Sequence, residues 1–231
     1  NTIDAIVRNN SIITTTTSTQ YEGIHLATSV GAEISGNKIV AETGAEYGMF
    51  IENCVNLVSG PTNIFNNFIV CAGQFFLAGI EINKSAYVNA YHNTVNIYSP
   101  TQGSYCLEIA GTGSSNVEIL NNIFTNNGIG YAFNVSPSPI GSVSAFDYND
   151  LYTVVGGAIG IYNNDTIADV LDLQTVHSVG LNSVSADPQY ISSTDLHSGS
   201  AGVNDLGIPL VSVVDDIDGE LRSGSSPDLG A

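Results

Sequence analysis

Two glutamates occupy equivalent positions in neighbouring segments of this sequence. Glu81 lies in Ile-Glu-Ile and Glu108 lies in Leu-Glu-Ile. If the aliphatic residues face inward on a strand, each glutamate faces outward, and stacked strands place the two about 5 Å apart. Carboxyl groups about 5 to 9 Å apart suit glycoside hydrolysis, with one as acid and one as nucleophile or base. The pair could equally bind Ca²⁺, or be two solvated carboxylates without a function.

A second candidate is an outward column of large side chains, two residues before a recurring asparagine. Phe65, Tyr91 and Leu120 follow one another in this column. Their polar neighbours are Asn63, Asn89 and Glu118. Outward aromatic rings among amides suit stacking on a neutral sugar chain, or contact with a protein. The alternative is that the C-terminal part of the chain covers this strip.

An acidic cluster near the C-terminus is a third candidate. Asp215, Asp216 and Asp218 precede Gly219, with Glu220 after it. The order resembles part of a calcium loop, although the full spacing with its distant glutamate is absent. The sequence therefore suggests either a Ca²⁺ site or a turn in which the aspartates cap backbone amides.

Bases are scarce. The only basic residues besides histidine are Arg8, Lys38, Lys84 and Arg222, and they fall in different registers. Polysaccharide lyases need such a residue to abstract a proton. The four histidines share no register either, which argues against a zinc site.

The charge balance argues against polyanionic partners. The chain carries 22 acidic residues against four Lys and Arg, a net charge of -18. Nucleic acid, anionic membrane surfaces and polyanionic sugars are repelled by such a chain. No apolar stretch is long enough to insert into a membrane.

The elements that position these residues follow from internal repeats. An asparagine two residues before an apolar residue recurs at steps of 27, 30, 26, 29 and 27 residues. These asparagines are Asn10, Asn37, Asn67, Asn93, Asn122 and Asn149. Stacked at a turn between strands, their side chains can satisfy unpaired backbone groups and bond to one another. We therefore predict a ladder of asparagines.

A second register keeps nearly the same period, with steps of 25, 31, 27, 26 and 26 residues. Each repeat holds short alternating runs that indicate strands with one buried face, and no helix-length pattern. In the column of the two glutamates, the expected outward residues are His25, Phe50, Glu81, Glu108, Asn134 and Gly160. Together the registers predict an all-β, right-handed parallel β-helix over residues 1–163, with about six coils of three short strands.

The repeats stop after about Asn163. We expect residues 164–231 to form a cap of the same structural domain, because an uncovered last coil exposes core and strand edges. A short helix is predicted over 166–176, with Asp165 or Thr166 as its N-cap, before an extended acidic tail. Three cysteines form no disulfide framework and are expected to be buried.

A family resemblance rests on ordered motifs from residue 146 to the end. They are Phe-Asp-Tyr-Asn-Asp-Leu-Tyr from 146, Ser-Ala-Asp-Pro-Gln-Tyr from 185, Asp-Leu-His from 195, Asp-Ile-Asp-Gly-Glu-Leu-Arg from 216 and Ser-Pro-Asp-Leu-Gly-Ala from 226. This order resembles the C-terminal portion of β-helix repeat proteins secreted by Bacteroidetes-type bacteria. The coils resemble the pectate-lyase-like fold generally. The resemblance implies a bacterial secreted or cell-surface location, other domains in a longer parent chain, and no particular chemistry.

Three functions follow as expectations. The first is a surface module that binds a polysaccharide or surface glycan, or serves in adhesion. The alternatives are a carbohydrate-active enzyme, hydrolase or lyase, and a purely structural stalk. Calcium is the one cofactor that the acidic residues suggest.

Overall fold

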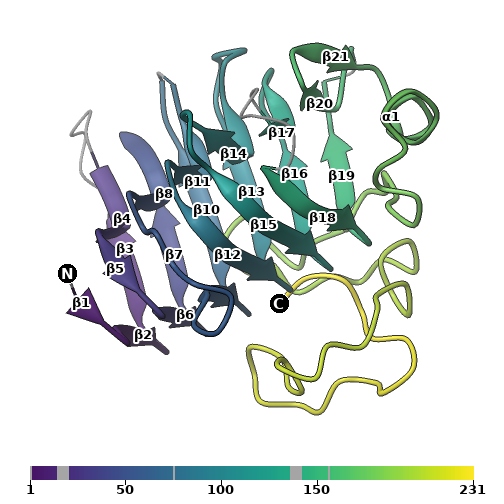
Figure 1. The fold of residues 1–231 in the computed structure, drawn as a ribbon. Helices are drawn as coiled ribbons and strands as arrows, with labels where there is room; N and C mark the ends of the chain where they lie inside the picture. Colours follow the sequence, from purple (N-terminus) through teal and green to yellow (C-terminus); the bar gives the residue numbers. More distant parts are fainter. Residues whose placement is uncertain (1, 15–20, 75, 136–141, 156) are drawn as a thin grey trace.

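The computed structural model describes residues 2–14, 21–74, 76–135, 142–155 and 157–231. Within them the chain coils into a parallel β-solenoid with three sheets (Figure 1). Two of the sheets contain six strands each and the third contains seven, and the chain makes about five turns. Six asparagine corners enclose five full turns, which is why counting the corners predicted six coils.

Each coil contributes one strand to a sheet, and sheet 3 gains one more strand, β21 (Asp165–Ile167), from the cap. Sheet 1 contains β2 (Ile6–Arg8), β6 (Glu33–Ser35), β9 (Thr62–Phe65), β12 (Ala86–Tyr91), β15 (Ser115–Leu120) and β18 (Val143–Asp147). Sheet 2 contains β3 (Ser11–Thr14), β7 (Lys38–Ala41), β10 (Phe68–Ala72), β13 (Thr94–Tyr98), β16 (Ile123–Asn126) and β19 (Asp150–Thr153). Sheet 3 contains β4 (Tyr21–Ala27), β8 (Ala45–Glu52), β11 (Ala78–Asn83), β14 (Tyr105–Ala110), β17 (Tyr131–Val135), β20 (Gly160–Tyr162) and β21 (Asp165–Ile167). A small extra pair joins β1 (Thr2–Ile3) to β5 (Ser29–Val30).

The core fills the space that the three sheets enclose. Inward residues of neighbouring coils stack directly, as Ile24, Met49, Ile80 and Leu107 do in sheet 3. One position departs from the predicted column: Gly160 pairs with Phe133, and Ile161 pairs with the outward Asn134. Gly160 faces inward because a Cβ there would lie 2.4 Å from the Phe133 ring.

The asparagine ladder is confirmed, and it runs in one direction. At each rung the backbone N–H and the side-chain Nδ2 donate to the Oδ1 of the next asparagine. Asn37 donates in this way to Asn67 at 3.0 and 2.9 Å. Each buried Nδ2 also donates to backbone carbonyls, as Asn93 does to those of Ile64 and Tyr91. The last rung, Asn149, donates its N–H to the Ser183 hydroxyl at 3.1 Å.

The cap closes the last coil with a short strand and a helix. Strand β21 pairs antiparallel with β20, and α1 (Val170–His177) follows it with Asp169 as its N-cap. The predicted start at 166, with Asp165 or Thr166 as N-cap, was therefore wrong. Residues 165–167 instead occupy the free edge of sheet 3, and the helix begins only after them. Leu173 of α1 packs into the same core as the coils.

The segment after α1 runs back along the coils, over the outer face of sheet 2 (Figure 1). Leu196 packs on Phe68 and Val70, and Val203 and Leu229 pack on Ile123. Polar contacts fix the segment at the ladder corner, where Arg222 donates to Asn66 Oδ1 at 3.0 Å and to the Gly230 carbonyl at 2.9 Å.

His92 completes this anchor as a neutral ring. Its Nδ1 lies 3.2 Å from the Gly230 carbonyl, and Asn121 Nδ2 lies 2.9 Å from its Nε2. Burial, with the nearby positive charge of Arg222, lowers the pKa of His92 to about 3. The ring can therefore donate from Nδ1 and accept at Nε2.

Cys54, Cys71 and Cys106 are free and buried, as predicted. No helix in the described part of the chain is long and apolar enough to cross a membrane.

Candidate functional site

The two candidate glutamates lie side by side on the outer face of sheet 3. Glu81 of β11 pairs with Glu108 of β14, in the predicted register. They are not solvated, however, because only 4% of Glu81 and 8% of Glu108 is exposed. Outward-facing residues of a sheet become buried when larger neighbours fold over them, and aromatic rings surround this pair.

These rings form a continuous row across neighbouring coils, which we call the aromatic row. Its members are Tyr47, Phe50, Phe76, Tyr105 and Tyr131. Tyr47 stacks on Phe50 at 4.6 Å between ring centroids, and Tyr105 stacks on Tyr131 at 5.9 Å. Phe76 lies edge-on between Tyr47 and Tyr105, at 6.3 and 6.2 Å. All five keep part of their surface exposed to solvent.

The row was missed in the sequence, although its signal is visible there. A tyrosine precedes the outward column by three residues in three coils, as Tyr47 before Phe50, Tyr105 before Glu108 and Tyr131 before Asn134. Strict alternation along a strand would turn residues at this offset inward. Gly48 breaks the alternation: a Cβ there would lie 2.5 Å from the Gly79 carbonyl oxygen, so the chain passes close to the next coil.

Beneath the row, the two carboxyl groups are held in a hydrogen-bond network. Asn83 Nδ2 donates to Glu81 Oε1 at 2.8 Å, and Asn134 Nδ2 donates to Glu108 Oε1 at 2.9 Å. The Tyr47 hydroxyl also hydrogen-bonds to Glu81, and the two carboxyl groups hydrogen-bond to each other. We call this hydrogen-bonded Glu81–Glu108 pair the acid pair.

The acid pair holds one proton near neutral pH. Burial, followed by the negative charge of Glu81, raises the pKa of Glu108 to about 7. Burial also raises the pKa of Glu81, although donors from Asn83 and Tyr47 oppose the shift. Two carboxyl groups in contact cannot both ionise. Because Glu81 receives more donors, the proton belongs on Glu108.

The two glutamates lie on adjacent coils, and hydrolytic carboxyl groups lie at least about 5 Å apart, so that a sugar carbon or a water fits between them. Hydrolysis would therefore require the two carboxyl groups to separate. The face as it stands offers a polar floor under exposed rings, which is a binding arrangement.

The predicted strip on sheet 1 has the expected register but little free surface. Phe65, Tyr91 and Leu120 are neighbours in β9, β12 and β15. Tyr91 is only 7% exposed, and its hydroxyl hydrogen-bonds to Glu118. Asn89 donates to Asn63 at 2.9 Å. Their polar groups therefore bond to one another rather than to solvent.

The alternative interpretation expected the C-terminal segment to cover this strip, and the segment borders it at Phe65. Phe65 lines a pocket of about 370 Å³ together with Val214 and Ile217 of that segment. The strip is thus flanked by the tail, and sheet 3 carries the more open aromatic surface.

The acidic loop is organised as a turn. Asp216 Oδ1 accepts from the backbone N–H groups of Asp218 and Glu220, at 3.0 and 2.9 Å. Asp218 contacts His197 Nε2 at 2.6 Å and Lys38 Nζ at 3.8 Å. In the described residues, no three His, Cys, Asp or Glu side chains are grouped to hold a metal ion.

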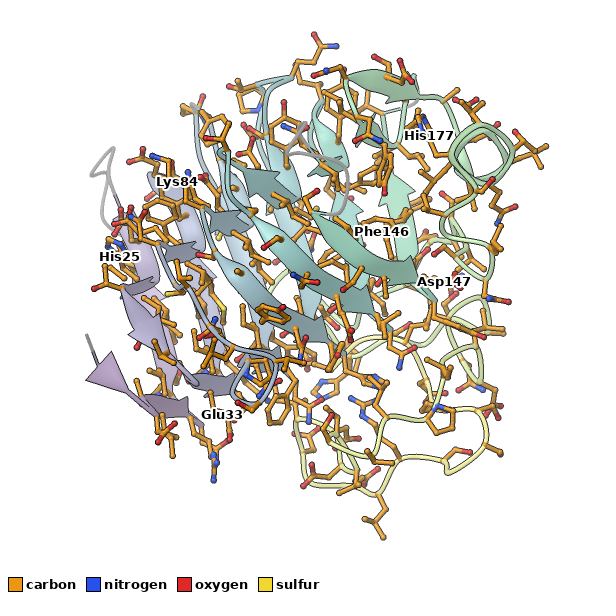
Figure 2. All side chains as sticks on the ribbon, viewed as in Figure 1. His25, Glu33, Lys84, Phe146, Asp147 and His177 are labelled. Carbon is orange, nitrogen blue, oxygen red and sulfur yellow. The ribbon has the colours of Figure 1, made fainter. Side chains whose placement is uncertain are left out.

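The histidines are scattered, as their lack of a common register predicted. His25 of β4 lies near the N-terminal end of the coil stack, and His177 is the last residue of α1 at the other end (Figure 2). A shared histidine site is therefore excluded for these two.

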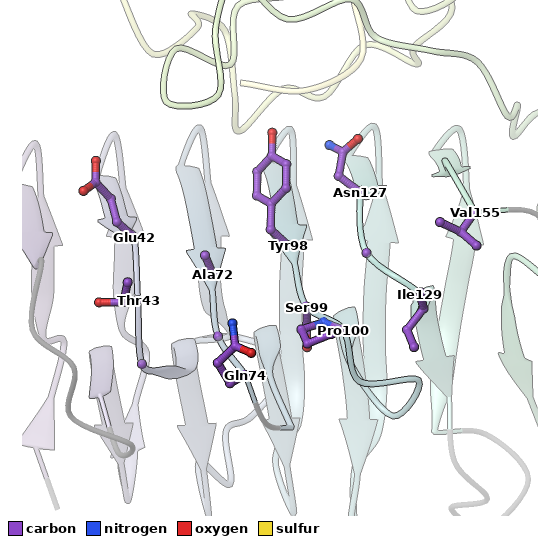
Figure 3. Close-up of a pocket in the computed structure, with 13 residues that line it drawn as sticks. Glu42, Thr43, Ala72, Gln74, Tyr98, Ser99, Pro100, Asn127, Ile129 and Val155 are labelled. Atoms are coloured by element: carbon purple, nitrogen blue, oxygen red, sulfur yellow. The ribbon is translucent and has the colours of Figure 1, made fainter.

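A groove of about 500 Å³ runs along the corner between sheets 2 and 3 (Figure 3). Tyr98 and Asn127 stand on one side of it, with Gln74, Pro100 and Ile129 on the other. Its floor includes Gly128, where a Cβ would lie 2.0 Å from the Ser99 carbonyl oxygen.

The chain was compared with protein families, curated proteins and solved structures. The similarity of the tail to secreted bacterial surface proteins stays a prediction. No protein-family model, curated protein or solved structure matches this chain.

Proposed function

We propose that the outer face of sheet 3 binds a neutral carbohydrate chain, and that the protein is a carbohydrate-binding module. One observation carries this proposal: partly exposed rings of the aromatic row lie directly beside the buried acid pair. Aromatic faces stack on the apolar faces of sugar rings, while carboxyl and amide groups take their hydroxyls.

Charge supports a neutral ligand. The net charge of -18 repels uronic acid polymers, and no Lys or Arg belongs to the aromatic row or the acid pair. A neutral sugar needs both hydrogen-bond donors and acceptors. The hydroxyls of the partly exposed Tyr105 and Tyr131 provide both kinds, above the mutually bonded acid pair.

The setting is proposed from the tail motifs. Their resemblance to secreted β-helix proteins supports a bacterial cell-surface location, where a glycan-binding module would serve in adhesion or capture of polysaccharide.

Binding to a panel of neutral polysaccharides, followed by titration calorimetry, tests the proposal. We expect Tyr105→Ala to weaken binding at least about tenfold, as the loss of one stacked ring implies. Tyr87→Ala is the matched control, because Tyr87 is a half-buried tyrosine of sheet 1 and lies outside the row. Absence of any neutral ligand would favour a structural stalk instead.

A second candidate is a carbohydrate-active enzyme, and the proton on Glu108 favours it. A carboxyl group with a pKa of about 7 can act as a general acid. Release of reducing ends that disappears in Glu108→Gln, while binding persists, would support hydrolysis over simple binding.

A further inference from the structure

Another pocket lies between the outer face of sheet 2 and tail residues 187–193, next to the corner groove, with which it shares Tyr98 and Asn127. Its volume is about 510 Å³, within the range of small-molecule sites. We call it the junction pocket. Its lining includes Tyr98, Thr125, Asn127, Tyr152, Asp187 and Gln189.

The register of sheet 2 fixes how the two tyrosines are separated. Thr125 of β16 pairs with Tyr152 of β19, and Asn96 of β13 pairs with Thr125. Tyr98 therefore lies two coils from Tyr152, roughly 10 Å along the solenoid. Both side chains line the junction pocket, and Tyr190 of the tail lines it beside them. Thr125 and Asn127 form the floor of the pocket.

The floor presents acceptors. Asn127 donates from its Nδ2 to Asn96 Oδ1 at 2.7 Å. The Oδ1 of Asn127 is not used in this bond and can act as an acceptor. Asn96 Nδ2 donates to the Tyr98 hydroxyl at 3.0 Å and so holds that ring. Thr125 Oγ1 lies 2.8 Å from the hydroxyl of Tyr190, which the tail places over the sheet.

The tail side of the junction pocket contributes a negative charge. Asp187 Oδ1 accepts from the Gln189 backbone N–H at 2.9 Å in a local turn, and the residue is exposed. Asp187 is the one charged side chain in the described lining, where no Lys, Arg or His occurs. The net charge of -18 adds an attractive field for cations.

We propose that the junction pocket binds an organic ammonium ion, held between Tyr98 and Tyr152 with Asp187 as its counter-ion. Tyrosine rings attract such cations through their faces, and a nearby carboxylate strengthens the attraction. A neutral sugar could hydrogen-bond to Asp187 but would gain no net charge attraction from it, so the charge of the ligand is the property to test. This site does not depend on carbohydrate binding at sheet 3.

Choline and its neutral isostere 3,3-dimethyl-1-butanol make the sharpest probes, because they share a shape and differ in charge. With the full chain, titration calorimetry should show choline binding at least about tenfold tighter than the isostere, and weakening as salt is added. Asp187→Asn should reduce choline affinity severalfold. This variant keeps the Oδ1 that caps Gln189, so the turn stays intact.

Tyr152→Ala should also weaken choline binding, with circular dichroism confirming that the fold persists. Tyr105→Ala, in the aromatic row, should leave it unchanged. Equal affinity for the isostere would overturn the proposal. So would no binding of choline at millimolar concentration, unchanged affinity in Asp187→Asn, or occupation of this pocket by a neutral sugar instead.

Discussion

Asp150 is a buried acid whose removal should make the protein more stable at neutral pH. The residue is fully buried beside the last ladder rung. Its Oδ1 accepts from the Ala186 N–H at 2.8 Å, and its Oδ2 has no hydrogen-bond partner. Burial raises the pKa of Asp150 from 3.8 to about 8. The folded protein therefore holds this proton at pH 7, whereas the unfolded chain has lost it.

The sign and size of the effect follow from linkage. Because the folded state binds the proton more tightly, the free energy of unfolding falls as pH rises from about 4 to about 8. One pKa unit corresponds to about 1.4 kcal/mol, so this group removes about 4 kcal/mol of stability between pH 4 and pH 7. Asp150→Asn keeps the acceptor for Ala186 and cannot ionise. Its advantage over the wild type should therefore grow by about 4 kcal/mol across that range.

Urea unfolding of both proteins at pH 4, 5, 6 and 7 measures this growth directly. The pH 4 pair is the internal control, because both side chains are then mostly neutral and any fixed cost of the substitution appears there. Parallel stability curves for the two proteins would refute the reasoning, since they would mean that Asp150 titrates normally in the fold.

Two further predictions concern the ladder and the tail anchor. Asn93→Ala removes the acceptor for Asn67 and three donated bonds in a fully buried site, and should lower the free energy of unfolding by roughly 3 kcal/mol or more. Asn10→Ala, at the exposed end of the same ladder, should cost less than about 1 kcal/mol; similar losses in urea unfolding would contradict the ladder's energetic role. His92 has a pKa lowered to about 3, so its contribution to stability is present above the unfolded pKa of about 6.5 and is lost as pH falls below it. The stability difference between wild type and His92→Gln should shrink by about 2 kcal/mol from pH 7.5 to pH 5, and a constant difference would show that the pKa of His92 is the same in the folded and unfolded states.

The stacking of the coils was readable from the sequence because it depends on residues that repeat. The asparagines and the aliphatic pairs each keep one period, and the structure pairs Glu81 with Glu108 as that period requires. Register within a repeat is fixed by the same alternation that buries one face. The prediction that Gly160 faces outward was wrong, because Gly160 pairs with the inward Phe133, whose ring leaves no room for a Cβ at that position.

The environment of the site depended on contacts that periodicity does not encode. The burial of Glu81 and Glu108 accompanies rings three residues before the outward column, an offset that strict alternation would turn inward. The start of the helix depended on whether residues 165–167 would pair with the edge strand β20, and that pairing is a tertiary contact. The junction pocket joins sheet 2 to residues 187–193, and no local pattern predicts such a contact.

The one-way ladder also bears on how this protein could change length. Every internal rung has the same two donors below it and the same acceptor above it. A duplicated coil placed between Asn67 and Asn93 would therefore find both of its neighbours already complementary. Beyond Asn149 the chain offers only the Ser183 hydroxyl, which cannot continue the pattern of paired donors. The ladder itself therefore allows a coil to be gained or lost in the interior of the stack, but the tail, which contacts both Asn66 and His92, would have to change its length with the stack.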